Sequence, residues 1–264
     1  MRLTVIGCTG SMSGPASPAS CYLVQATGPG DDGVPRTWTL VLDLGPGAFG
    51  RLLGHMDPAD VDMVVLSHLH ADHISDMISY HVFRRWHPNG ALGPVRVLAP
   101  AGAVDRVRGV GGDGPEEMYA GEFTFERHRE GEPLEIGPFR IESFLVVHPV
   151  EAYAVRITGP SENGSAPTTL TFTGDADTCE SLVEASRGVD LLLADAAFVD
   201  GRDEVRGIHL TGTRAGEVAA EAGAGRLVLT HIQPWTDLDE VVIPAREAYG
   251  GEVETARSGA VWEL

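Results

Sequence analysis

The segment LSHLHADHISD, residues 66–76, contains an unusual density of side chains that can bind metal ions. His68, His70, Asp72 and His73 fall within six positions there. Imidazoles and carboxylates are the ligands of zinc-type sites, and two histidines separated by one residue in extended backbone point to the same side. The pattern therefore predicts a metal-binding segment rather than four unrelated polar residues on a loop.

This segment is predicted to join a strand to a helix. The run VDMVVLS, residues 61–67, is rich in β-branched and apolar residues and predicts a buried strand. Apolar residues then recur at helical spacing, which predicts a helix from Ile74 to about Trp86. Asp72 and His73 would lie where the helix begins, and there a carboxylate can cap the helix or turn outward as a ligand favoured by the helix dipole.

Three more residues of metal-binding type follow predicted strands. His148 ends FLVVH, Asp175 follows the strand in TLTFTGD, and His231 closes RLVLTH. Each alone has an ordinary interpretation as a polar residue at a turn. Together they can reach a shared edge of the sheets, which is what a site with two metal ions needs.

The remaining pattern predicts an α/β protein with a β-rich first half and an alternating second half. Helices are expected over about 178–187, 213–222 and 238–249, between strands. Two sheets packed face to face with helices outside would bury these elements. Two loops stand out: the Gly-rich acidic stretch Gly111–Glu122, which is predicted to be a mobile flap near the site, and a polar loop at residues 159–168.

Length and composition favour a single globular domain over residues 1–264. The chain has a mass of 28.0 kDa and is 43% hydrophobic. It contains no apolar run of membrane-spanning length, and its start lacks a signal-peptide pattern, so we expect a cytoplasmic protein without a membrane partner. Cys8, Cys21 and Cys179 are an odd number without a C-x-x-C pair, which fits a reducing compartment.

The charge is strongly acidic. The formal net charge is −19, and all 19 basic residues are arginine. Such a protein repels long polyanions, so a long nucleic acid is not the expected partner. Small anions remain compatible, because a pair of divalent ions dominates the potential at close range.

The order H-x-H-x-D-H, strand-end His, TGD and LTH resembles the metallo-β-lactamase superfamily. Within it, the segments GCTGSMSGP, TFTGDADTC, LLLADAAF, HLTGTRAGEVA and LVLTHIQPW resemble the ribonuclease Z-like phosphodiesterases over nearly the whole chain. The pattern is similar to compact actinobacterial members reported as cyclic-nucleotide phosphodiesterases. The resemblance implies an αββα sandwich with the site at one edge of the two sheets, and it allows a homodimer.

The resemblance also implies two divalent metal ions, most simply zinc, although manganese or iron would suit the same ligands. A hydroxide held between the ions would attack the substrate, because metal binding lowers the pKa of water toward about 7. The implied ligands are His68, His70 and His148 for one ion, Asp72, His73 and His231 for the other, and Asp175 as a bridge.

Two more catalytic residues are implied by the resemblance. His209, in GIHLTG, matches the family histidine that contacts the phosphate, and Asp195, in LLLADAAF, matches the acid that orients it. Ribonuclease Z proper usually has Glu there, so the shorter Asp195 leaves open whether the two side chains touch. The alternative is a histidine at a helix entry and a buried acid with a local hydrogen bond. Asp72 is a third catalytic candidate, because family members suggest that it shares in proton handling.

The predicted reaction is hydrolysis of a small phosphodiester such as 3′,5′-cyclic AMP. A first alternative is ribonuclease Z proper, but only 26 residues separate His148 from Asp175, too few for the folded arm that grips tRNA. A second alternative is hydrolysis of an acyl substrate, namely a lactone, thioester or β-lactam, for which the same metals would serve. A third is a non-catalytic binding protein, which the complete ligand set disfavours.

Overall fold

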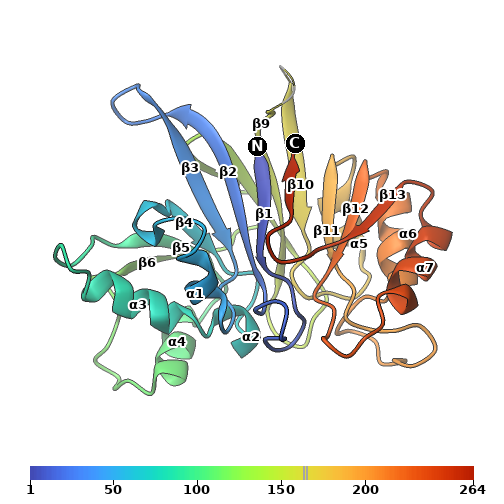
Figure 1. Cartoon of the computed structure of the whole chain (residues 1–264), viewed down its shortest axis with the longest axis horizontal. Coiled ribbons are helices and arrows are strands. Elements are labelled where there is room, and N and C mark those ends of the chain that lie inside the picture. Colours follow the sequence, from blue (N-terminus) through green and yellow to red (C-terminus); the bar gives the residue numbers. More distant parts are fainter. Residues whose placement is uncertain (163, 165) are drawn as a thin grey trace.

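The structure is a computed structural model that describes residues 1–162, 164 and 166–264 (Figure 1). These described residues form two seven-stranded mixed sheets. The first sheet has the order β14 (Val261–Glu263), β1 (Arg2–Gly7), β2 (Cys21–Pro29), β3 (Pro35–Leu42), β4 (Met63–Val65), β5 (Val95–Ala99) and β6 (Phe123–Arg127). The second has the order β13 (Glu252–Thr255), β12 (Arg226–Thr230), β11 (Leu191–Asp195), β10 (Pro167–Phe172), β9 (Tyr153–Pro160), β8 (Phe139–Leu145) and β7 (Leu134–Ile136).

The helices lie outside the two facing sheets (Figure 1). Those of the first half are α1 (Ala48–Leu52), the 3₁₀ turn η1 (Pro58–Asp60), α2 (Ala71–Ile74), α3 (Met77–Arg85) and α4 (Ala103–Gly111). Those of the second half are α5 (Glu180–Ser186), α6 (Gly212–Ala222) and α7 (Asp239–Ala248). Among the described residues, no helix combines the length and apolar character needed to cross a membrane.

Three apolar layers separate the four layers of secondary structure. In β2, Tyr22 and Val24 belong to the layer between the sheets, whereas Leu23 belongs to the layer under the helices of the first half. Successive strand side chains point to opposite faces, so an apolar residue at every position is expected for a strand buried on both sides. The third layer lies between the second sheet and α5 to α7. This arrangement confirms the predicted αββα sandwich.

The parallel strands explain where a site can form. Strands β3 to β6 run parallel to one another, and so do β10 to β13. The carboxyl ends of parallel strands meet at one edge, which is where α/β proteins gather functional residues. This edge is the lower one in Figure 1, beside α2.

The predicted helix over residues 74–86 is wrong in detail, because two shorter helices, α2 and α3, occupy this region. The Asp76 N–H donates to the Leu44 carbonyl (3.0 Å), and the Leu44 N–H donates to the His73 carbonyl (2.7 Å). These tertiary bonds divert two backbone groups that a continuous helix would use. The strand predicted over 61–67 is likewise shortened to β4, and His148 lies beyond the end of β8.

The segment Gly111–Glu122 is tied to the helices beside it. Arg85 pairs with Glu117 (2.8 Å) and Glu122 (2.9 Å), and the Tyr119 side chain is fully buried. Mobility of this segment stays a prediction, as does the single-domain organisation over residues 1–264. Of the polar loop predicted at residues 159–168, residues 163 and 165 lie outside the described residues.

Candidate metal centre

The loop between β4 and α2 carries His68 and His70, α2 itself carries Asp72 and His73, and Ser67 anchors the start of the loop. The Ser67 N–H donates to Asp43 Oδ1 (2.7 Å), and its hydroxyl donates to Asp43 Oδ2 (2.9 Å). The backbone stays extended at His70, and α2 begins at the next residue. His68 Nε2 and His70 Nδ1 consequently lie 3.0 Å apart, on the same side of the chain as the spacing predicts.

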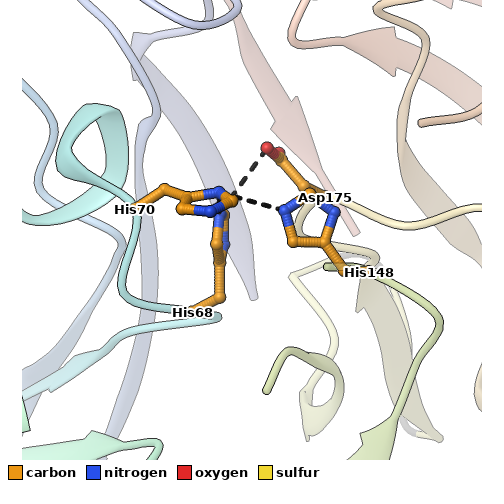
Figure 2. Close-up of side chains that lie close together, drawn as sticks. All are labelled: His68, His70, His148 and Asp175. Atoms are coloured by element: carbon orange, nitrogen blue, oxygen red, sulfur yellow. Dashed lines mark hydrogen bonds and ion pairs between the residues drawn. The ribbon is translucent and has the colours of Figure 1, made fainter. Parts of the chain in front are cut away.

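The first group of converging side chains is His68, His70, His148 and Asp175, which point toward one another in Figure 2. His148 Nε2 lies 3.0 Å from His70 Nδ1, and His68 Nε2 lies 3.6 Å from Asp175 Oδ2. All the candidate ligand atoms of this group lie within 4.8 Å of one another. Residues from both sheets therefore meet at one point.

The second group is Asp72, His73, His231 and again Asp175. His73 Nε2 lies 3.2 Å from Asp72 Oδ2 and 3.2 Å from Asp175 Oδ1. His231 Nε2 lies 3.4 Å from Asp175 Oδ2. Asp175 belongs to both groups, so its carboxylate joins them into one cluster. The structure thus brings together all seven of the predicted ligands.

The chemistry of this site fits a metal ion. Among the described residues, His73 Nε2 and Asp175 Oδ1 are buried side-chain atoms of this site without a hydrogen-bond partner. Buried polar atoms are normally paired, and a donor set of imidazole nitrogen and carboxylate oxygen is what a divalent cation binds. The unpaired atoms and the donor set point to the same kind of ligand.

Burial and neighbouring charges favour a cation at this position. Burial lowers the pKa of His68, which keeps its imidazole neutral and able to bind a metal. Burial alone would raise the pKa of Asp175, but the surrounding histidines hold it well below its usual range. Burial would lower the pKa of His73, but Asp175 and Asp43 raise it well above its ordinary value. Positive charge is thus stabilised between these carboxylates.

Asp43 is a further residue of the site, which no sequence pattern had singled out. It is fully buried after β3, and its Oδ2 lies 2.6 Å from His73 Nδ1. A carboxylate that accepts from Nδ1 fixes the tautomer, so that Nε2 of His73 faces the site. Its backbone φ of 55° is unusual for a residue other than glycine. The available signal was an aspartate at a strand end, the same signal that identified Asp175.

The amino-terminal loop packs closely against His231. A Cβ on Gly10 would lie 2.0 Å from the His231 carbonyl oxygen, so only glycine permits this approach. The Ser11 N–H donates to His231 Nε2 (3.3 Å). Both Ser11 (61°) and His231 (60°) have positive φ, a strain found typically at functional sites. This contact gives Gly10 and Ser11 of the GCTGSMSGP motif a structural role beside the metal-binding groups.

His209 and Asp195 make the contact that the sequence left open. His209 Nδ1 lies 2.9 Å from Asp195 Oδ2, and Asp195 ends the buried strand β11. Burial alone would lower the pKa of His209, but the charge and hydrogen bond of Asp195 raise it to about 9. His209 Nδ1 also lies 3.9 Å from Asp175 Oδ2, so the pair borders the metal-binding groups.

Residues 39–232 match the β-lactamase superfamily domain, and the chain therefore belongs to the metallo-β-lactamase superfamily. It is a metallo-hydrolase of this fold, with clusters of His and Asp suited to metal binding.

Three relatives refine this assignment. An uncharacterized protein of Mycobacterium leprae is 39% identical over 100% of this chain and 89% of its own length. The probable metallo-hydrolase YhfI of Bacillus subtilis is 32% identical over the full length of both chains. Its crystal structure has a TM-score of 0.84 with 29% identity, covering 100% of this chain and 99% of that one. Ribonuclease Z of Myxococcus xanthus is 28% identical over 85% of this chain and 88% of its own, which supports the ribonuclease Z-like branch.

Proposed function

We propose that this metallo-hydrolase cleaves phosphodiesters, and that 3′,5′-cyclic AMP is a substrate of the preferred size. The observation that carries the proposal is the His209–Asp195 pair beside the metal-binding groups. The metal site alone would serve a hydrolase of this fold that cleaves an acyl bond. A protonated histidine beside the metals adds a positive group, which suits the anionic phosphate of a phosphodiester.

The seven clustered side chains would hold two divalent ions, with His68, His70 and His148 at one, Asp72, His73 and His231 at the other, and Asp175 between them. Such ions supply Lewis acidity and lower the pKa of a bound water, so that hydrolysis runs at neutral pH. Zinc is the proposed metal, and manganese or iron would also suit this donor set.

The protein groups beside the ions handle binding and protons. His209, held by Asp195 through its Nδ1, would direct Nε2 to a phosphate oxygen and donate a proton toward the leaving oxygen. The charge and hydrogen bond of Asp195 raise the pKa of His209 against the effect of burial, which favours the protonated imidazole that this role needs. Asp72 would serve as a ligand and share in proton handling: neighbouring His73 and His231 lower the pKa of this carboxyl against the effect of burial, and its side chain remains 16% exposed.

A small substrate fits the rest of the molecule better than tRNA. The interval between His148 and Asp175 contains β9, β10 and a short loop, and its described residues form no additional domain. A net charge of −19 also opposes a long polyanion. Similarity to ribonuclease Z of Myxococcus xanthus nevertheless makes cleavage of precursor tRNA the second candidate.

The remaining parts of the proposal concern the cellular state of the protein. We propose a cytoplasmic protein that can form a homodimer. All three cysteines are free, which suits a reducing compartment.

The test is turnover of four substrates by one metal-quantified preparation, each with and without a chelator. The substrates are 3′,5′-cyclic AMP, bis-p-nitrophenyl phosphate, a precursor tRNA and nitrocefin. We expect chelator-sensitive cleavage of cyclic AMP and of the synthetic diester. Cleavage of precursor tRNA alone would favour the second candidate, and cleavage of nitrocefin without phosphodiester turnover would reject the proposed reaction class.

A further inference from the structure

We infer that Asp177 is a positioning residue, which holds the segment carrying His209 against the metal-binding groups. This inference rests on the proposed function, because it assigns His209 a place in the reaction. Asp177 lies two residues after Asp175, in the TGDAD segment.

Asp177 is a buried carboxylate, 2% exposed, surrounded by donors from three parts of the chain. Its Oδ2 accepts from the Gly207 N–H (2.7 Å) and from Arg206 Nε (2.7 Å). Its Oδ1 accepts from Arg214 Nη1 (2.7 Å) and from the Thr178 N–H (2.7 Å). Charge-assisted bonds of this kind are shorter and stronger than neutral ones, so the carboxylate fixes its neighbours firmly.

The fixed segment reaches the site within two residues. Gly207 has a φ of 80°, a turn geometry that glycine adopts without strain, and Ile208 and His209 follow it. The Ile208 carbonyl accepts from His148 Nδ1 (2.9 Å), which fixes the face that this histidine presents to the site. Displacement of Gly207 would therefore move His209 relative to Asp195 and remove the support of His148.

A second backbone contact ties the same segment to the His148 loop. The Asp177 N–H donates to the Val147 carbonyl (2.9 Å), one residue before His148. Asp177 thus lies where the chains bearing Asp175, His148 and His209 meet. Its backbone N–H bonds the loop before His148, and its carboxylate bonds the segment before His209.

Arg206 offers a way to test positioning apart from folding. Its side chain is 62% exposed, so it adds little to the core, yet it donates two bonds to Asp177. Arg214, by contrast, is buried, and Asp177→Asn would leave its charge without a partner. Arg206→Gln therefore loosens the outer side of this contact while the buried side remains.

The experiment compares Asp177→Asn, Arg206→Gln and Arg206→Lys with the wild type. The matched control is Asp190→Asn, because Asp190 accepts three similar bonds from Thr168 and Thr169 (2.7–2.9 Å) at the opposite end of β11 from Asp195. Each metal-loaded protein is assayed for kcat and KM with bis-p-nitrophenyl phosphate. Metal affinity is measured separately by zinc competition with a chromophoric chelator.

For Asp177→Asn we expect kcat to fall about 10- to 100-fold, since a misplacement near 1 Å costs about that much, while KM changes less than about threefold. Loss of the support for His148 should weaken the affinity of one zinc ion about tenfold or more. Arg206→Gln should show the same pattern to a smaller extent, and Arg206→Lys should restore part of it. Asp190→Asn should match the wild type in both measurements.

Wild-type kcat together with wild-type zinc affinity in Asp177→Asn would overturn the inference, as would equal losses in the control. If Asp177→Asn does not fold, Arg206→Gln decides by the same criteria. Failure of the proposed function can be told apart from failure of this inference. In the first case the wild type cleaves no phosphodiester, but the zinc competition still compares the metal affinities of the variants.

Discussion

Lowering the pH from 7 to 5 is expected to destabilise this protein through one buried histidine, His128. Its side chain follows β6 and is 6% exposed. Nε2 lies 3.0 Å from the Leu66 carbonyl, which can only accept, so Nε2 carries the hydrogen and Nδ1 accepts from the Ser143 hydroxyl (2.8 Å). The neutral ring therefore supports the end of the strand that leads into the metal-binding loop.

The magnitude follows from the pKa of His128. Burial lowers this pKa from 6.5 to about 4. The unfolded chain takes up the proton first as the pH falls, so the stability contributed by the neutral ring is lost between about pH 6.5 and pH 4. At pH 5 the loss is about 2 kcal/mol, which corresponds to a decrease in Tm of about 4–8 °C for a chain of this size.

The assay is thermal unfolding, followed by circular dichroism, of wild type and His128→Gln at pH 7 and pH 5. Both proteins are treated with chelator, because acid also releases metal from histidine ligands. Glutamine can donate to the Leu66 carbonyl and accept from Ser143, but it does not titrate. We expect the Tm of the wild type to fall about 4–8 °C further than that of the variant. Parallel decreases in the two proteins would refute the reasoning.

Three other predictions concern the site. Asp43→Asn should weaken zinc affinity about 10- to 100-fold, because His73 Nδ1 loses its carboxylate acceptor. Competition with a chelator measures the zinc affinity, and an unchanged affinity would contradict this role of Asp43. His209→Ala should lower kcat for a phosphodiester about 100-fold or more while elemental analysis still finds the wild-type metal content, and undiminished cleavage would remove it from the mechanism. Arg106→Gln should raise KM for an anionic substrate with little change in kcat, because the Arg106 Nε donates to the Leu69 carbonyl (2.9 Å) and its charge acts on the metal-binding loop. Arg51→Gln is the control, and equal KM values in the two variants would argue against this role of Arg106.

The fold and the clustering of candidate ligands were predictable because both depend on local patterns. H-x-H-x-D-H places four ligand-type side chains within six consecutive residues, and His148, Asp175 and His231 each follow a run of apolar residues. The order of the strands in the two sheets then brings these ends to one edge of the fold. A pattern of period two and the order of the elements are enough to predict this result.

Other features depend on tertiary contacts that no local pattern encodes. The break between α2 and α3 results from bonds to Leu44, which comes about thirty residues earlier in the chain. The contact between Asp195 and His209 depends on the path of the backbone between them, so side-chain length alone could not predict it. Helix α4 was missed because its sequence, AVDRVRGVG, ends in glycines that are typical of loops.

The origin of the ligands in both sheets has a consequence for stability. The loop after β4 and the helix α2 that follows it supply His68, His70, Asp72 and His73, whereas His148, Asp175 and His231 follow strands of the second sheet. A metal ion bound between them contacts both halves of the sandwich. Because the unfolded chain lacks this arrangement, the free energy of metal binding adds to the free energy of folding. The same ions that supply the chemistry would therefore hold together the edge of the fold at which the chemistry takes place.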